Sequence, residues 1–179
     1  DWEYEVIEQY GRNIVGRYRV ERTAEAEEER ISINNGAREL THRLPAEALH
    51  MHVFRLPSDN NYWITDFSPY LNPTRLPQSD SLVTLDMGDM SPCVGRVRVR
   101  GEESVETGAG TFKATRVQVE CRFQKTSSRS GQSTLFLDAW YAPEVGRVVR
   151  IDKRVPPSSP DDLGEERESY RLKRWQGLP

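Results

Sequence analysis

The amino-acid sequence predicts a mostly β protein: an antiparallel meander of strands that forms a curved sheet, a half-barrel or a sandwich with little helix. Apolar and polar residues alternate through most of the chain, and this period of two is typical of strands with one buried face. Glycine, proline and asparagine separate the alternating runs, as expected of turns. Only 36% of the 179 residues are apolar, which favours a thin sheet with one wet face over a deep apolar cavity.

Three hairpins are predicted in the first half of the chain. Their strands run over residues 2–6 with 16–20, 31–33 with 37–44, and 48–56 with 61–67. The second hairpin turns at Asn34-Asn35-Gly36, because Asn-Gly accepts the positive φ that a tight hairpin requires. The acidic run 24–30 has helix-forming residues but no apolar stripe, so we expect a solvated connection or charged strand ends on an exposed edge.

A proline-rich segment over residues 68–80 separates the two halves and fits either a linker or a long crossing loop. We expect a single β domain over 1–179, with a division into 1–68 and 79–179 as the alternative. In the second half, strands are predicted over 94–100, 115–123, 134–141, 147–155 and 168–175. Residues 79–87 fit a strand or a short helix.

Cys93 and Cys121 are the two cysteines of the chain. In a regular hairpin that turns near Thr107 they face each other on the apolar side, close enough to form a disulfide after a small adjustment. A bulge near Ala114, where the alternation slips, would shift this register. The disulfide would imply secretion or a periplasm, and two buried free thiols are the alternative. The chain opens at Asp1 without a methionine, so we expect a processed or trimmed chain although no signal peptide is visible.

The charge pattern excludes some partners. A net charge of -3 gives no basic surplus for nucleic acid or an anionic membrane, and no apolar run approaches the roughly 18 residues of a membrane span. Of 25 basic residues four are lysine, which leaves 21 arginines. Codon bias explains this count, or else the arginines form a recognition surface for carboxylates or phosphates.

Four aromatic residues cluster beside the proline-rich segment, namely Tyr62, Trp63, Phe67 and Tyr70. Exposed aromatic residues next to prolines often form a contact patch. Ordinary core packing and anchoring of the loop is the alternative explanation.

No residue pattern indicates an active site. His50 and His52 lie two apart on one predicted strand, but nothing nearby completes a metal site. Asp66, Asp138 and Asp152 are candidate catalytic carboxylates only if the fold brings two of them together. We therefore expect a protein that is not an enzyme and needs no metal or cofactor.

Two stretches of the second half resemble a known group of proteins. Residues 106–114 read E-T-G-A-G-T-F-K-A, and residues 140–150 read W-Y-A-P-E-V-G-R-V-V-R. With the opening D-W-E-Y, they resemble uncharacterised exported proteins of proteobacteria, in which an A-G-T-F-x-A turn is followed by a W-Y-A-P-x-x-G hairpin. The resemblance implies an envelope β-sheet domain, with a curved half-barrel like that of lipoprotein carriers as one form, and it transfers no catalytic residue.

The W-Y-A-P motif also has a physical interpretation. Pro143 fixes φ and Gly146 accepts a left-handed conformation, so together they define a turn. Trp140 and Tyr141 point to opposite faces of the sheet. One is expected to anchor the core, and the other to cover the sheet edge or pack on an arginine. This makes the motif structural rather than catalytic.

These observations favour a non-enzymatic binding or assembly domain in the periplasm or cell envelope, or a secreted one. Its expected partner is another envelope protein, contacted through an exposed strand edge or the aromatic loop. The alternative is a carrier of a small apolar or lipid ligand on the concave face of the curved sheet.

Overall fold

The computed structural model describes residues 1–8, 14–22, 28–34, 36, 38–43, 51–55, 62–66, 81–85, 91–124, 132–157 and 165–176. These residues form strands and contain no helix. In chain order the strands are β1 (Trp2–Glu8), β2 (Ile14–Arg22), β3 (Glu28–Ile33), β4 (Arg38–Arg43), β5 (Met51–Arg55), β6 (Tyr62–Asp66), β7 (Ser81–Leu85), β8 (Cys93–Thr107), β9 (Gly110–Gln124), β10 (Gln132–Ala142), β11 (Arg147–Val155) and β12 (Glu166–Trp175).

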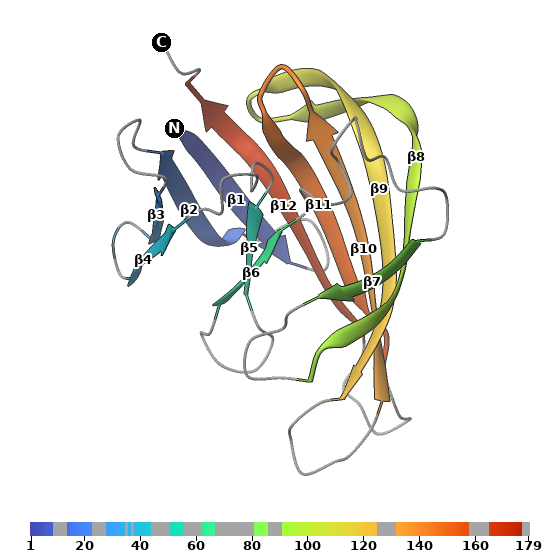
Figure 1. The fold of residues 1–179 in the computed structure, drawn as a ribbon. Coiled ribbons are helices and arrows are strands. Elements are labelled where there is room, and N and C mark those ends of the chain that lie inside the picture. The colour runs from blue at the N-terminus through green and yellow to red at the C-terminus, as the bar shows by residue number, and fades with distance from the viewer. Residues whose placement is uncertain are drawn as a thin grey trace.

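Ten strands form one antiparallel sheet in the order β4-β3-β2-β1-β12-β11-β10-β9-β8-β7. The strands β1 to β4 run from the middle of the sheet to one edge. The strands β7 to β12 return from the other edge to the middle, where β12 pairs with β1. Figure 1 shows this sheet curling into a half-barrel. The predicted fold class is therefore confirmed, and strands from both sides of segment 68–80 lie in the same sheet.

The three hairpins predicted in the first half are confirmed. β1 pairs with β2, β3 with β4 and β5 with β6, the last pair forming a separate two-stranded sheet. At the second hairpin, Asn34 and Gly36 have φ values of 49° and 88°, as the Asn-Gly sequence favours. Residues 81–85 form the strand β7, so the short helix considered for this segment is not formed.

The sheet has one buried and one solvated face. On the buried face, called the inner face here, apolar side chains alternate along the strands and form the core, with Val20, Ile31, Leu135, Leu137, Ile151 and Leu172 at its centre. The opposite or outer face carries ion pairs between neighbouring strands. Arg116 lies 2.9 Å from Asp138, and Lys173 lies 2.5 Å from Glu5. Polar side chains are thus tolerated because only one face is withdrawn from water.

The alternation in β9 changes phase along the strand. Val117 and Cys121 are buried towards one end of β9, whereas Ala114 and Phe112 are buried towards the other. The irregularity lies on β8 between Val99 and Glu102, which are paired with Val117 and Thr115 of β9, so it falls beside Ala114 as the sequence predicted. Two residues of β8 face one of β9 there, which bends and twists the pair.

Beyond the bulge, β8 and β9 form an arm, residues 102–115, that bends across β10 and β11 towards β12 (Figure 1). The tip of the arm is fixed because the Ala109 amide donates a hydrogen bond to the Leu172 carbonyl of β12, at 3.2 Å. Along β9, the side that faces outward in the sheet is therefore the side that is buried in the arm, where it carries Ala114 and Phe112.

Candidate functional site

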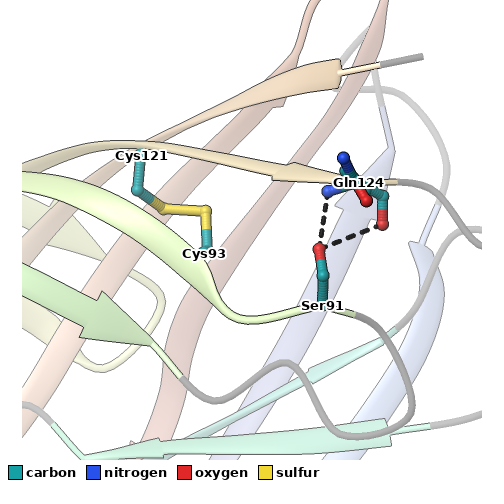
Figure 2. Close-up of a disulfide and its surroundings, with 4 residues drawn as sticks. All are labelled: Ser91, Cys93, Cys121 and Gln124. Atoms are coloured by element: carbon teal, nitrogen blue, oxygen red, sulfur yellow. Dashed lines mark hydrogen bonds between the residues drawn. A yellow bond between two sulfur atoms is a disulfide. The ribbon is translucent and has the colours of Figure 1, made fainter.

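Cys93 and Cys121 are joined by a disulfide, with their Cα atoms 5.4 Å apart (Figure 2). The predicted register, in which the two cysteines are direct neighbours, is wrong. Cys121 is paired with Gly95, so the bond crosses the strands diagonally. The position of the turn explains the difference. Thr107 is paired with Gly110, so the turn is centred between Gly108 and Ala109 rather than on Thr107, and the bulge in β8 offsets the resulting shift by one residue only.

Gly95 makes this diagonal disulfide possible. A Cβ at this position would lie 2.0 Å from the Glu120 carbonyl oxygen and 2.4 Å from Cys121 Cα. No side chain fits at these distances, so a residue other than glycine would push β8 away from β9. Ser91 adds a second link beside the disulfide, since its hydroxyl accepts from the Gln124 amide at 2.6 Å and lies 3.3 Å from the Gln124 carbonyl (Figure 2).

The strand next to this link, β7, is the last strand at one edge of the sheet. Its sequence, Ser-Leu-Val-Thr-Leu, carries no charge. Leu82 is 81% exposed and its neighbour on β8, Val94, is 54% exposed. Natural edge strands usually carry charges or prolines that prevent pairing with another chain. The opposite edge strand, β4, reads Arg-Glu-Leu-Thr-His-Arg and follows that rule, whereas β7 does not.

Arginines surround the exposed apolar side chains of this edge. Leu82 is paired with Arg96 on β8, and Val94 is paired with Arg122 on β9. Arg96 is paired in turn with Glu120 on β9, which is an acidic side chain beside these arginines. We call Leu82, Val94, Arg96 and Arg122 the β7 edge patch.

The W-Y-A-P motif forms the turn between β10 and β11. The Gly146 amide donates to the Ala142 carbonyl at 3.0 Å, and Gly146 has a φ of 70°. This turn leans onto the inner face of β1. The Trp2 indole N–H donates to the Val145 carbonyl at 3.3 Å, and the Tyr4 hydroxyl donates to the Val148 carbonyl at 2.8 Å.

Trp140 lies on the outer face, between the inward turn and the outer arm. The guanidinium groups of Arg116 and Arg150 lie 5.3 and 4.8 Å from the centre of its rings. Its indole N–H donates to Glu103 of the arm. Tyr141 is half-buried against the core. Trp140 thus packs on arginine, and the motifs at 106–114 and 140–150 meet in one structure that closes this end of the sheet.

A buried ion pair on the inner face was missed from the sequence. Arg147 and Glu29 are 3% and 2% exposed, and their side chains meet at 2.5 Å. The acidic run 24–30 was expected to be solvated, but β3 begins at Glu28 and turns Glu29 inward. The guanidinium of Arg147 also lies over the Trp2 rings, 4.8 Å from their centre. The pair fixes the turn of β11 against β3.

Tyrosines extend this polar cluster. The rings of Tyr4 and Tyr18 stack with their centres 4.8 Å apart. Burial raises the pKa of Tyr4, and it raises the pKa of Tyr18 well above its ordinary value. Both hydroxyls therefore remain protonated at neutral pH. Lys153 and Tyr170 both donate to Glu168 nearby, at 3.1 and 2.7 Å.

The fold brings two of the candidate carboxylates together. Asp138 and Asp152 are direct partners across β10 and β11. Each is part of the ion network of the outer face: Arg116 donates to Asp138 at 3.0 Å, and Arg150 lies 2.5 Å from Asp152. Ser169 also donates to Asp152, at 2.7 Å. This arrangement is that of a charged surface, and no group of three metal-binding side chains occurs among the residues described.

The predicted aromatic patch cannot be placed as a whole. Tyr62 and Trp63 belong to β6, but their side chains lie outside the described part of the structure, as do Phe67 and Tyr70 entirely. His50 and the proline-rich segment also lie outside it. Where the chain is described, no helical segment has the length and apolar character needed to cross a bilayer.

No family model matches the chain, and no curated protein matches it. Among solved structures, it is similar to a "putative lipoprotein" of Parabacteroides distasonis, with 12% identity and a TM-score of 0.49 over 97% of this chain and 92% of that chain. It is also similar to a "putative exported protein with YmcC-like fold" of Bacteroides fragilis, with 14% identity and a TM-score of 0.41 over 97% and 93%. Neither likeness assigns a ligand or partner, and the resemblance to proteobacterial exported proteins stays a prediction.

Proposed function

We propose that this protein is a non-enzymatic binding protein of the periplasm or cell envelope, which receives a strand of another envelope protein at its β7 edge. The observation that carries the proposal is the combination of an edge strand without charges and a leucine that is 81% exposed on it. Backbone N–H and C=O groups along an open edge form a template for an added strand.

The disulfide supports the proposed location in the periplasm or cell envelope. Bonds between cysteines form and persist in secreted and periplasmic proteins and are rare in the cytosol. Here the bond joins β8 to β9 beside β7, so it holds the strand on which β7 is built. A rigid neighbour lowers the entropy lost when a further strand is added.

An apolar carrier receives less support. Four charged side chains, Glu29, Arg147, Lys153 and Glu168, are buried with the core. In addition, the turn between β10 and β11 occupies part of the inner face next to Trp2 and Tyr4. A lipid bound there would have to displace hydrogen-bonded protein groups, which is costly.

A photo-crosslinking amino acid at position 82, in protein expressed in its native host, tests the proposed surface. We expect a discrete crosslinked product from position 82 and none from position 113 on β9, an exposed site on the arm. When Leu82 is replaced by Glu, crosslinking from position 84 should lose this product, because a charged edge resists pairing. Equal products from positions 82 and 113 would contradict a β7 interface.

The compartment is tested separately. Protein from its native source is alkylated without reduction and weighed, and then weighed again after reduction and alkylation. We expect alkylation only after reduction. Two thiols alkylated in the unreduced protein would remove the support that the disulfide gives to export.

A further inference from the structure

We infer that the strand received at β7 is acidic, with carboxylate side chains on its outer face beside an apolar residue that meets Leu82. This inference rests on the proposed function and names the chemistry of its partner. It follows from the two arginines of the β7 edge patch, which form no ion pair among the described residues.

Several arginines and lysines away from β7 are neutralised by carboxylates, although Arg30 and Arg174 are in no ion pair among the described residues. Ion pairs join Arg116 to Asp138, Arg150 to Asp152, Arg19 to Asp1, Arg154 to Glu165 and Lys173 to Glu5, at 2.5 to 3.3 Å. Even the very exposed Lys113 lies 2.6 Å from Glu102. Many cations of the outer face therefore have an acidic neighbour.

The β7 edge patch departs from that pattern. Among the described residues, neither Arg96 nor Arg122 is in an ion pair, and both are exposed. Arg100, further along β8, uses its Nε to bond the Gln118 amide oxygen at 2.6 Å rather than a carboxylate. Glu120 is the partner of Arg96 in the sheet. It offsets part of the positive charge of Arg96 and Arg122, and the net charge of the three side chains remains positive.

The geometry matches these charges to an added strand. Side chains that are direct partners share one face of a sheet, so Leu82 and Arg96 project from the outer face together, as do Val94 and Arg122. A strand beside β7 would place its own outer side chains next to Leu82. Arg96 on β8 is long enough to reach past Leu82 towards that strand, and it can bind a carboxylate with two parallel hydrogen bonds. Arg122, one strand further away on β9, adds to the local positive charge.

An exposed leucine flanked by arginines is also typical of a surface that binds an anionic membrane. The acidic strand is favoured because the open element is a strand edge, whose backbone groups can be satisfied by another strand but not by lipid. Membrane binding is therefore one of the outcomes that the experiment separates.

The experiment uses three labelled peptides of about seven residues, the usual length of a strand. Each alternates valine with threonine and has two of its polar positions filled by Glu, Gln or Lys. Fluorescence anisotropy with the whole chain should show the Glu peptide binding about tenfold more tightly than the Gln peptide, and the Lys peptide most weakly. High salt should reduce this preference.

Substitutions test whether the preference for the Glu peptide arises from the β7 edge patch. In Arg96→Glu/Arg122→Glu the order of Glu and Lys peptides should reverse, whereas Lys113→Glu, a charge reversal on the arm, should leave it unchanged. Leu82→Ser should weaken binding of the Glu and Gln peptides alike, because it removes the apolar contact without adding a charge. All these positions are exposed, so the fold should be retained.

The possible failures are distinct. Equal binding of the Glu and Gln peptides would overturn the acidic partner and leave strand addition in place. No binding of any peptide would count against the β7 edge as a whole. If vesicles of phosphatidylglycerol and phosphatidylcholine sediment the protein, dependent on Leu82 and Arg96, while no peptide binds, the patch is a membrane surface and the inference is wrong.

Discussion

Arg147 and Glu29 form an ion pair on the inner face of the sheet although 118 residues separate them in the chain. The pair joins the turn after β10 to β3, which lies several strands away in the sheet. Two charges so deeply buried are tolerated only together, because each alone would lack compensation for lost water.

Removal of one partner should therefore cost more than removal of both. We expect Glu29→Leu to lower the free energy of unfolding by about 3–5 kcal/mol. The double variant Glu29→Leu/Arg147→Leu should lose less than that single variant. Urea unfolding measures both, with Arg154→Leu as a surface control that changes stability by at most about 1 kcal/mol. Equal losses in single and double variants would mean that the charge of Arg147 needs no partner.

The stacked tyrosines predict a loss of stability in alkaline solution. Burial raises the pKa of Tyr18 above its ordinary value, so the unfolded chain releases this proton at lower pH than the folded one. The contribution of the neutral hydroxyl is complete below about pH 10, the unfolded pKa, and is lost as pH rises towards the folded pKa. Urea midpoints measured between neutral and strongly alkaline pH should fall, and Tyr18→Phe should flatten the fall. An unchanged slope in Tyr18→Phe would assign the alkaline effect to other groups.

Gly95 should be intolerant of any side chain. In Gly95→Ala the new Cβ would collide with backbone of β9 at 2.0 and 2.4 Å, so we expect destabilisation of more than about 2 kcal/mol. Gly101→Ala is the matched control, because nothing lies within 4 Å of its Cβ position, and its stability should change by less than about 1 kcal/mol. Thermal unfolding of the oxidised proteins compares them. Similar melting temperatures in both variants would show that β8 shifts without cost.

The arm should open when its contact to Trp140 is lost. In Glu103→Ala the indole N–H loses its acceptor, and the Ala109 amide at the tip should exchange its hydrogen faster. Glu106→Ala, an exposed change on the same arm, serves as the control. Hydrogen exchange followed by mass spectrometry reads the peptide that contains Ala109. Unchanged exchange in Glu103→Ala would mean that the Leu172 contact holds the arm unaided.

Local pattern predicts much of this fold, because alternation and turn residues act over short distances. The strands β1, β2 and β8 to β12 lie where the alternation places them, and Asn34 and Gly36 turn the chain as expected. The cysteines were assigned to each other from their shared phase and from a turn placed near Thr107. Their register was wrong because the hairpin turns at Gly108-Ala109 and β8 carries a bulge, and alternation fixes neither position to within one residue.

Contacts between residues far apart in the chain could not be predicted from the sequence. Nothing in the acidic run around Glu29 signals that one of its carboxylates meets Arg147. An exposed strand edge was predicted only as one of two possible contact surfaces and no strand was named, since the order of the strands is what leaves β7 at the edge. That Arg96 is in no ion pair with the residues the structure describes likewise follows from three-dimensional neighbours and not from composition.

The pairing of β1 with β12 affects the order in which parts of the sheet fold. These two strands lie next to each other in the middle of the sheet, yet they are the most distant strands along the chain. Contacts of such sequence separation form slowly. As a chain emerges from its N-terminal side, β1 must wait with one edge open until β12 arrives. We expect the central seam, rather than either outer meander, to set the rate of folding and to be the place where a helper protein would act.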